Sequence, residues 1–115
     1  MAFLALTAAA CGSASSSQTS AANLGSAVQQ DCISVADVLA DGPDPDADPV
    51  GYAQAQVLPL RQLTISDAAL HTAVLSLASA YETFTTSAKS TRAASSAAVA
   101  KAENEVSKIC PQAAQ

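Results

Sequence analysis

Large apolar side chains recur at the spacing of an α-helix in the middle of this chain of 115 residues. A helix carries side chains separated by alternating gaps of four and three residues on a single face, and that face is stable only when other elements cover it. The chain is therefore predicted to fold around a central amphipathic helix. Its apolar face consists of Leu70, Val74, Leu77, Tyr81 and Phe84.

Capping residues and prolines predict where two helices begin. Thr64 and Asp67 lie three residues apart, as in a capping box, and they predict that the central helix starts at Thr64. Asp48 followed by Pro49 predicts the start of an earlier helix, because proline fits the first turn. Pro59 should kink or end that earlier helix nearby, since proline removes a backbone donor.

Two further helices are predicted near the ends of the chain. The first spans about residues 21–39, and the last spans about residues 89–109 and ends before Pro111. No segment alternates as a β-strand does. The apolar face of the first helix holds Leu24, Val28, Cys32, Val35 and Leu39, and that of the last holds Val99, Ala102, Val106 and Ile109.

Four helices joined by short connections favour an all-α fold, a small antiparallel bundle in which the first and last helices lie side by side. Apolar residues make up 50% of the chain but aromatic residues only 3%, so alanine supplies much of the apolar share. Alanine favours helices and buries little surface. The bundle should have a small core that a covalent cross-link would stabilise.

The first ten residues form an uncharged apolar run that ends in three alanines before Cys11. Such a run is typical of a secretory signal peptide and is too short for a membrane span of about 20 residues. Residues 6–11, Leu-Thr-Ala-Ala-Ala-Cys, resemble the lipobox of small bacterial lipoproteins of the alanine-rich type found in high-GC Gram-positive bacteria. The resemblance implies that Cys11 receives a lipid, which anchors the chain at the outer face of the cell membrane.

Two alternatives stay open for this segment. The three alanines also fit an ordinary cleavage site, after which the protein would be secreted without an anchor. No lysine or arginine precedes the apolar run, so a second interpretation places the true start upstream of Met1. A longer signal would then precede the same cysteine.

The sequence predicts four segments. Residues 1–10 are the signal, and residues 11–20 are the lipidated cysteine with a serine-rich tether. Small polar residues of this kind predict a flexible spacer. Residues 21–110 form the helical bundle, and residues 111–115 form a C-terminal tail.

The chain has three cysteines, and an odd number leaves one thiol to be explained in an exported protein. If Cys11 carries a lipid, Cys32 and Cys110 remain as a pair in a compartment where disulfides persist. We therefore expect a Cys32–Cys110 disulfide. A cross-link that closes so long a loop should stabilise the fold by about 4 kcal/mol in the chain-entropy model.

Charge excludes one class of partner. The net charge is −5, and the five basic residues are scattered along the chain. Nucleic-acid binding requires clustered cations that displace counterions, so no nucleic-acid partner is expected. The basic residues are Arg61, Lys89, Arg92, Lys101 and Lys108.

Two groups of residues are candidates for a metal or a ligand. Asp44, Asp46 and Asp48 alternate as in a calcium loop, but the neighbouring prolines favour a rigid, solvated turn instead. His71, Tyr52 and Tyr81 are candidate ligand-binding residues, because histidine and tyrosine both ligate haem iron. The alternative is that His71 lies at the edge of the buried face or in solvent and that Tyr81 is part of the core.

No catalytic motif is present in the sequence. One histidine without a nucleophile elbow and four scattered glycines provide neither a catalytic triad nor a phosphate loop. We expect an exported, lipid-anchored, non-enzymatic binding or structural module without a cofactor, which presents a surface to a protein partner in the cell envelope. The alternative is a carrier that holds a small apolar or haem-like ligand between its helices.

Overall fold

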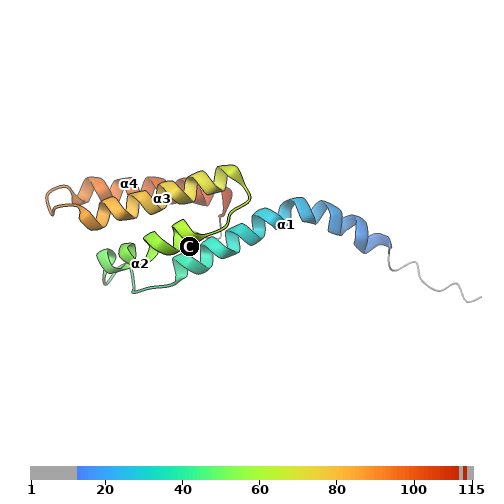
Figure 1. Cartoon of the computed structure of the whole chain (residues 1–115), viewed down its shortest axis with the longest axis horizontal. Helices are drawn as coiled ribbons and strands as arrows, with labels where there is room; N and C mark the ends of the chain where they lie inside the picture. Colours follow the sequence, from blue (N-terminus) through green and yellow to red (C-terminus); the bar gives the residue numbers. More distant parts are fainter. Residues whose placement is uncertain (1–12, 112, 114–115) are drawn as a thin grey trace, which may run out of the picture.

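The computed structural model describes residues 13–111 and residue 113, and it has four helices and no strand in these residues. The helices are α1 (Ser13–Ala40), α2 (Pro49–Gln62), α3 (Ala68–Thr86) and α4 (Arg92–Ile109). Figure 1 shows α3 and α4 side by side, with α2 and the C-terminal half of α1 beneath them. The all-α class is confirmed, and the antiparallel order of all four helices stays a prediction. The signal segment and Cys11 lie outside the described residues.

The first helix is longer than the sequence predicts. It begins at Ser13 rather than near Ala21, so residues 13–20 are helical instead of forming the flexible spacer that their composition indicates. Residues 13–20 include one alanine and one glutamine among serines and a threonine, and each of these polar residues costs at most about 0.7 kcal/mol relative to alanine in a helix, so the composition permits a helix. The N-terminal half of α1 consequently extends past the ends of the other helices (Figure 1).

The start of α2 is as predicted. Asp48 is the N-cap, its Oδ1 accepts a hydrogen bond of 3.0 Å from the Gly51 backbone N–H, and Pro49 occupies the first turn. The helix continues through Pro59 and ends one turn later at Gln62. Proline therefore ends α2 nearby rather than at the preceding residue.

The connection between α1 and α2 is held by a buried glutamine. The Gln56 side chain is fully buried, and its Nε2 donates a hydrogen bond of 2.7 Å to the Asp41 backbone oxygen. Gly42 follows with φ of +99°, which only glycine adopts readily. These two residues fix the turn that leads to Pro45.

The start of α3 differs from the prediction, since its N-cap is Asp67 and not Thr64. The Asp67 side chain accepts a hydrogen bond of 2.8 Å from the Leu70 backbone N–H. The preceding residue is held outside the helix, because Ser66 donates through both its backbone N–H and its hydroxyl to Asp31 Oδ2, at 3.1 and 2.9 Å. Contact with α1 thus delays the helix by three residues.

The last helix also starts later than predicted, at Arg92 rather than near Lys89. The Thr91 backbone N–H donates a hydrogen bond of 3.0 Å to the Ala88 backbone oxygen. Residues 88–91 therefore form a turn before the helix. The helix ends at Ile109, before Pro111, as expected. Beyond it, Ala113 is buried against the core, so part of the predicted tail packs on the bundle.

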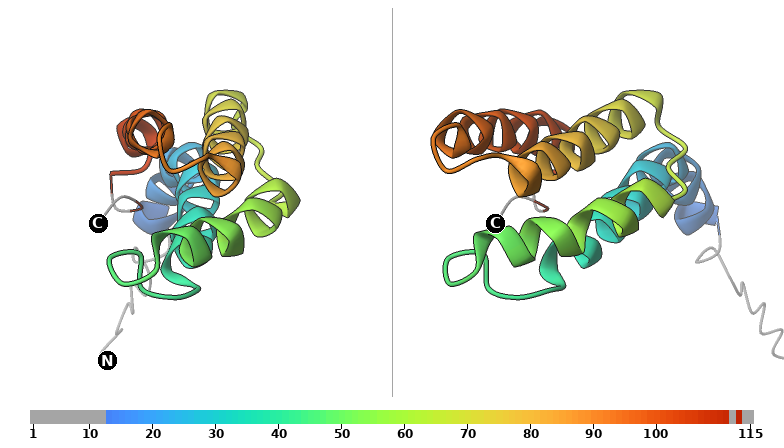
Figure 2. Two further views of the ribbon diagram at one scale, coloured as in Figure 1. Left: turned by 90° about the vertical axis from the view of Figure 1, so that its left-hand side faces the viewer. Right: turned by 60° about the vertical axis from the view of Figure 1, so that its left-hand side comes forward.

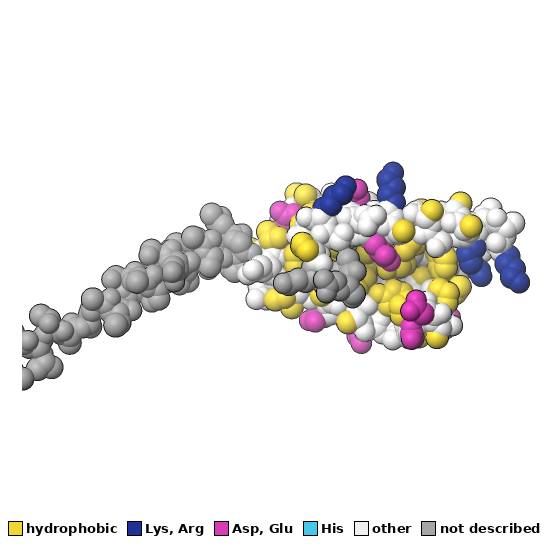
Figure 3. All heavy atoms as spheres, turned by 180° about the vertical axis from the view of Figure 1, so that it is seen from behind, with side chains coloured by type: hydrophobic (Ala, Val, Ile, Leu, Met, Phe, Trp, Pro, Cys, Tyr) yellow, Lys and Arg dark blue, Asp and Glu magenta, His cyan; other side chains and the backbone are white. Residues whose placement is uncertain are grey.

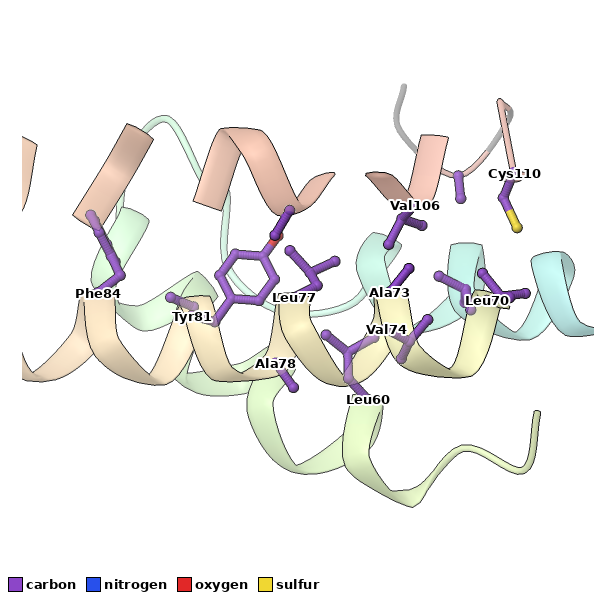
Figure 4. Packing of buried hydrophobic residues seen from close by; sticks show 14 residues of the cluster. Leu60, Leu70, Ala73, Val74, Leu77, Ala78, Tyr81, Phe84, Val106 and Cys110 are labelled. Atoms are coloured by element: carbon purple, nitrogen blue, oxygen red, sulfur yellow. The ribbon is translucent and has the colours of Figure 1, made fainter. Parts of the chain in front are cut away.

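The core is built around the predicted apolar face of α3 (Figure 4). All five residues of that face are buried, and Leu70, Val74 and Leu77 are fully inaccessible to solvent. Because α3 packs on both α2 and α4, its apolar face is covered from two sides. The other buried apolar residues are Val35, Ala53, Leu60, Ala73, Ala78, Ala102, Val106, Cys110 and Ala113.

The expected disulfide is present. Cys32 of α1 and Cys110, the C-cap of α4, are bonded, with their Cα atoms 5.4 Å apart. Cys32 lies well inside its helix and Cys110 just after the end of its own, so the two helices are offset along their length. Because of this offset, the N-terminal half of α1 extends beyond the other helices (Figure 1).

The Cys32→Ser/Cys110→Ser double variant should unfold at a lower denaturant concentration than the parent chain. Removing a cross-link between residues 78 positions apart should reduce the free energy of unfolding by about 4 kcal/mol, because the unfolded chain regains loop entropy. Urea unfolding followed by circular dichroism measures this loss. A matched Cys11→Ser variant should unfold like the parent, and an equal loss in that variant would contradict the assignment.

Candidate ligand-binding cleft

A cleft opens where the four helices meet. Its larger cavity has a volume of about 440 Å³, and a smaller one of about 130 Å³ adjoins it through shared lining residues. Figure 3 shows apolar side chains gathered in a hollow between the helices. The larger cavity is lined by Ala36, Leu39, Ala40, Pro45, Tyr52, Leu77, Tyr81, Glu103, Val106 and Ala113, and the smaller one shares Pro45, Tyr52, Tyr81 and Glu103.

Two tyrosines form the wall common to both cavities. The ring centroids of Tyr52 and Tyr81 lie 5.9 Å apart, with the ring planes at 81°, an edge-to-face contact. Tyr52 comes from α2 and Tyr81 from the apolar face of α3, so the packing of these helices brings the rings together. Figure 4 shows the Tyr81 ring lying across the core from α3.

Both phenolic hydroxyls donate to acceptors within the protein. The Tyr52 hydroxyl donates a hydrogen bond of 2.6 Å to the Leu39 backbone oxygen at the end of α1. The Tyr81 hydroxyl donates one of 3.0 Å to Glu103 Oε1 on α4. The tyrosine pair therefore connects α2 to α1 and α3 to α4 around the cleft.

The environment of the cleft keeps both tyrosines protonated. Burial raises the pKa of Tyr81 well above its ordinary value, and the negative charge of Glu103 raises it further. The pKa of Tyr52 is raised as well, mainly by burial. The phenols thus act as hydrogen-bond donors to their partners throughout the neutral range.

The predicted haem-ligating set is not brought together. His71 is exposed, as the sequence indicates for a residue next to the buried face. It precedes Tyr81 by ten residues on the same helix, which separates the two positions by about 15 Å along the helix axis. Tyr52 and Tyr81 meet in the cleft, whereas His71 does not line it.

The aspartates between α1 and α2 serve the backbone. Asp44 Oδ1 accepts a hydrogen bond of 2.8 Å from the Asp46 N–H, and Asp48 caps α2. Within the described residues, no group of three or more histidine, cysteine, aspartate or glutamate side chains is placed to hold a metal ion. These contacts give Asp44 and Asp48 a role in the backbone of the turn.

Comparison of the chain with family models, with curated proteins and with solved structures gives no match.

Glu103 is the site residue that sequence reasoning missed. It lies four residues after Val99 and three before Val106, so it borders the apolar face of α4. A carboxylate in such a position has to be satisfied by a partner when the face is covered. The position of Glu103 beside the apolar face could therefore have indicated a site residue. Its partner, Tyr81, becomes evident only when α3 and α4 are packed together.

The tyrosines should resist ionisation as long as the protein is folded. An unfolded chain loses phenolic protons near the ordinary pKa of 10.0, whereas folded Tyr81 keeps its proton. Stability should therefore be retained below that pH and fall above it, by up to about 1.4 kcal/mol per pH unit for Tyr81. Alkaline titration of the near-ultraviolet absorbance of tyrosinate, read beside circular dichroism, checks this.

The Tyr81→Phe variant should lose much of this alkaline sensitivity, because it has no phenol to ionise at that position. Release of both phenolic protons from a chain that still has its full helical circular dichroism would contradict the prediction.

Proposed function

We propose that this protein is an exported, lipid-anchored and non-enzymatic module that binds a small apolar ligand in the cleft between its helices. The observation that carries the proposal is the larger cavity, whose volume of about 440 Å³ falls within the range of about 300–1,000 Å³ typical of small-molecule sites. Most of the side chains that line it are aliphatic or aromatic, which is also typical of such sites.

Export is supported by the disulfide, because such bonds persist in oxidising compartments and are rare in the cytosol. The lipid anchor is supported by the resemblance of residues 6–11 to a lipobox. Among the described helices, none combines the length and the apolar character needed to cross a bilayer.

A surface for a protein partner has less support. The large exposed apolar side chains of the described residues are Ile33, Leu58 and Leu75, one on each of α1, α2 and α3. Single exposed apolar residues are common on monomeric proteins and do not by themselves mark an interface. The cleft is therefore the feature on which the proposed function is based.

Decanol should bind the oxidised protein at a ratio of one to one. The chain contains two tyrosines and no tryptophan, and both tyrosines line the cleft, so tyrosine emission reports binding there directly. Ala36 lines the larger cavity, and an Ala36→Phe variant should fill it and weaken binding by at least about tenfold. Isothermal calorimetry provides an independent affinity.

Ala100→Phe is the matched control, because Ala100 is exposed on α4 and does not line either cavity. Equal affinities of the two variants, or a parent protein that leaves decanol unbound, would refute the ligand-binding function.

The anchor has a separate test. Replacing Cys11 by serine should move the protein from the membrane fraction to the medium, because the modified thiol is lost. Immunoblots of fractionated cells measure the distribution, and the intact mass of the parent protein should include the lipid. Unchanged fractionation of the variant would count against lipidation at Cys11.

A further inference from the structure

Among the described residues, the polar side chains at the larger cavity have already used their donors. Tyr52 donates its hydroxyl proton to the Leu39 oxygen, and Tyr81 donates its proton to Glu103 Oε1. The other side chains that line this cavity are alanine, leucine, proline and valine, which have no polar atoms. What these residues offer to a ligand are acceptors, namely hydroxyl lone pairs and the second carboxylate oxygen of Glu103.

Glu103 also makes the cleft negative. It lines both cavities, and no lysine, arginine or histidine among the described residues lines either of them. The ion pairs of the described part join Arg61 to Glu82 and Lys108 to Glu105, and neither includes Glu103. The carboxylate is partly exposed, so a molecule in the cleft can reach it.

The Tyr81 hydroxyl adds an acceptor beside Glu103. It donates its proton to the carboxylate and keeps lone pairs that a cation can approach. A cation paired with Glu103 would lie close to the hydroxyl end of Tyr81, since these two side chains are hydrogen-bonded.

We infer that the ligand of the cleft is an amphiphile with an apolar body and a protonated amine, whose ammonium group is held by Glu103. The inference rests on the proposed function and adds the chemical class of the ligand. The apolar body would contact Ala36, Leu39 and Pro45, which line the larger cavity and keep exposed surface.

The same arrangement disfavours anionic ligands. A fatty acid or a haem propionate would bring a second negative charge beside Glu103, and the larger cavity has no basic side chain among its described residues to compensate it. A neutral alcohol would fill the apolar part and donate one hydrogen bond. Ammonium, alcohol and carboxylate ligands of equal length should therefore bind in that order of affinity.

The test uses decylammonium, decanol and decanoate with the oxidised protein that begins at residue 11, with Cys11 replaced by serine so that no lipid competes for the cleft, at neutral pH and below the concentrations at which the probes form micelles. Decylammonium should bind at least about tenfold more tightly than decanoate, because a hydrogen bond to a charged group contributes more than one between neutral groups. Tyrosine emission and isothermal calorimetry measure the three affinities.

Glu103→Gln removes the charge and keeps an acceptor for the Tyr81 hydroxyl, so the cleft should stay folded. This variant should lose about tenfold in affinity for decylammonium and less in affinity for decanol, so the preference for the amine should shrink. Glu105→Gln is the matched control, because Glu105 is exposed on the same helix and pairs with Lys108. It should keep the preference for decylammonium.

The outcomes separate this inference from the proposed function. If decanol binds but decylammonium binds no more tightly than decanoate, the amine class is wrong and the apolar site stands. An equal loss in Glu103→Gln and Glu105→Gln would overturn the role of Glu103, because the overall charge of the chain would then explain the preference. If none of the three probes binds, the amine class and the proposed ligand-binding function both fail.

Discussion

The position of α1 in the fold depends on how it is attached to the other three helices. Two consecutive residues make the attachment, because Asp31 accepts hydrogen bonds from Ser66 and from the Asp67 backbone N–H while Cys32 is bonded to Cys110. One residue thus holds α1 to the start of α3, and the next holds it to the end of α4. The start of α3 and the end of α4 therefore both contact the same part of α1. The small core is stabilised by this cross-link as well as by burial.

The cleft follows from the same attachment and from the composition of the chain. Alanine forms much of the wall that α1 presents, including Ala36 and Ala40, and its short side chain leaves space that a larger residue would fill. Tyr52 and Tyr81 line this space, and their hydroxyls reach the end of α1 and the middle of α4. The polar ends of two core residues therefore define the geometry of the site.

Periodicity and capping predicted much of the fold. The five residues of the apolar face of α3 are buried as expected, Asp48 caps α2, and the cysteine pair is bonded. The predicted start of α3 at Thr64 is wrong because the carboxylate of Asp31, distant in sequence, binds Ser66 and leaves Asp67 as the cap. The site was predicted only through its two tyrosines. Glu103 was missed because its role requires knowing which side chain of α3 lies opposite, and that is a property of helix packing rather than of local sequence.

The early start of α1 changes how the domain would stand at a membrane. A flexible spacer lets an anchored domain take any height and orientation within its reach. A helix from Ser13 to Cys32 instead acts as a strut of about 28 Å, since each residue adds about 1.5 Å along the axis. With a lipid on Cys11, such a strut would hold the bundle at a nearly constant length of chain from its anchor while the helix tilts, whereas a flexible spacer would let that separation vary.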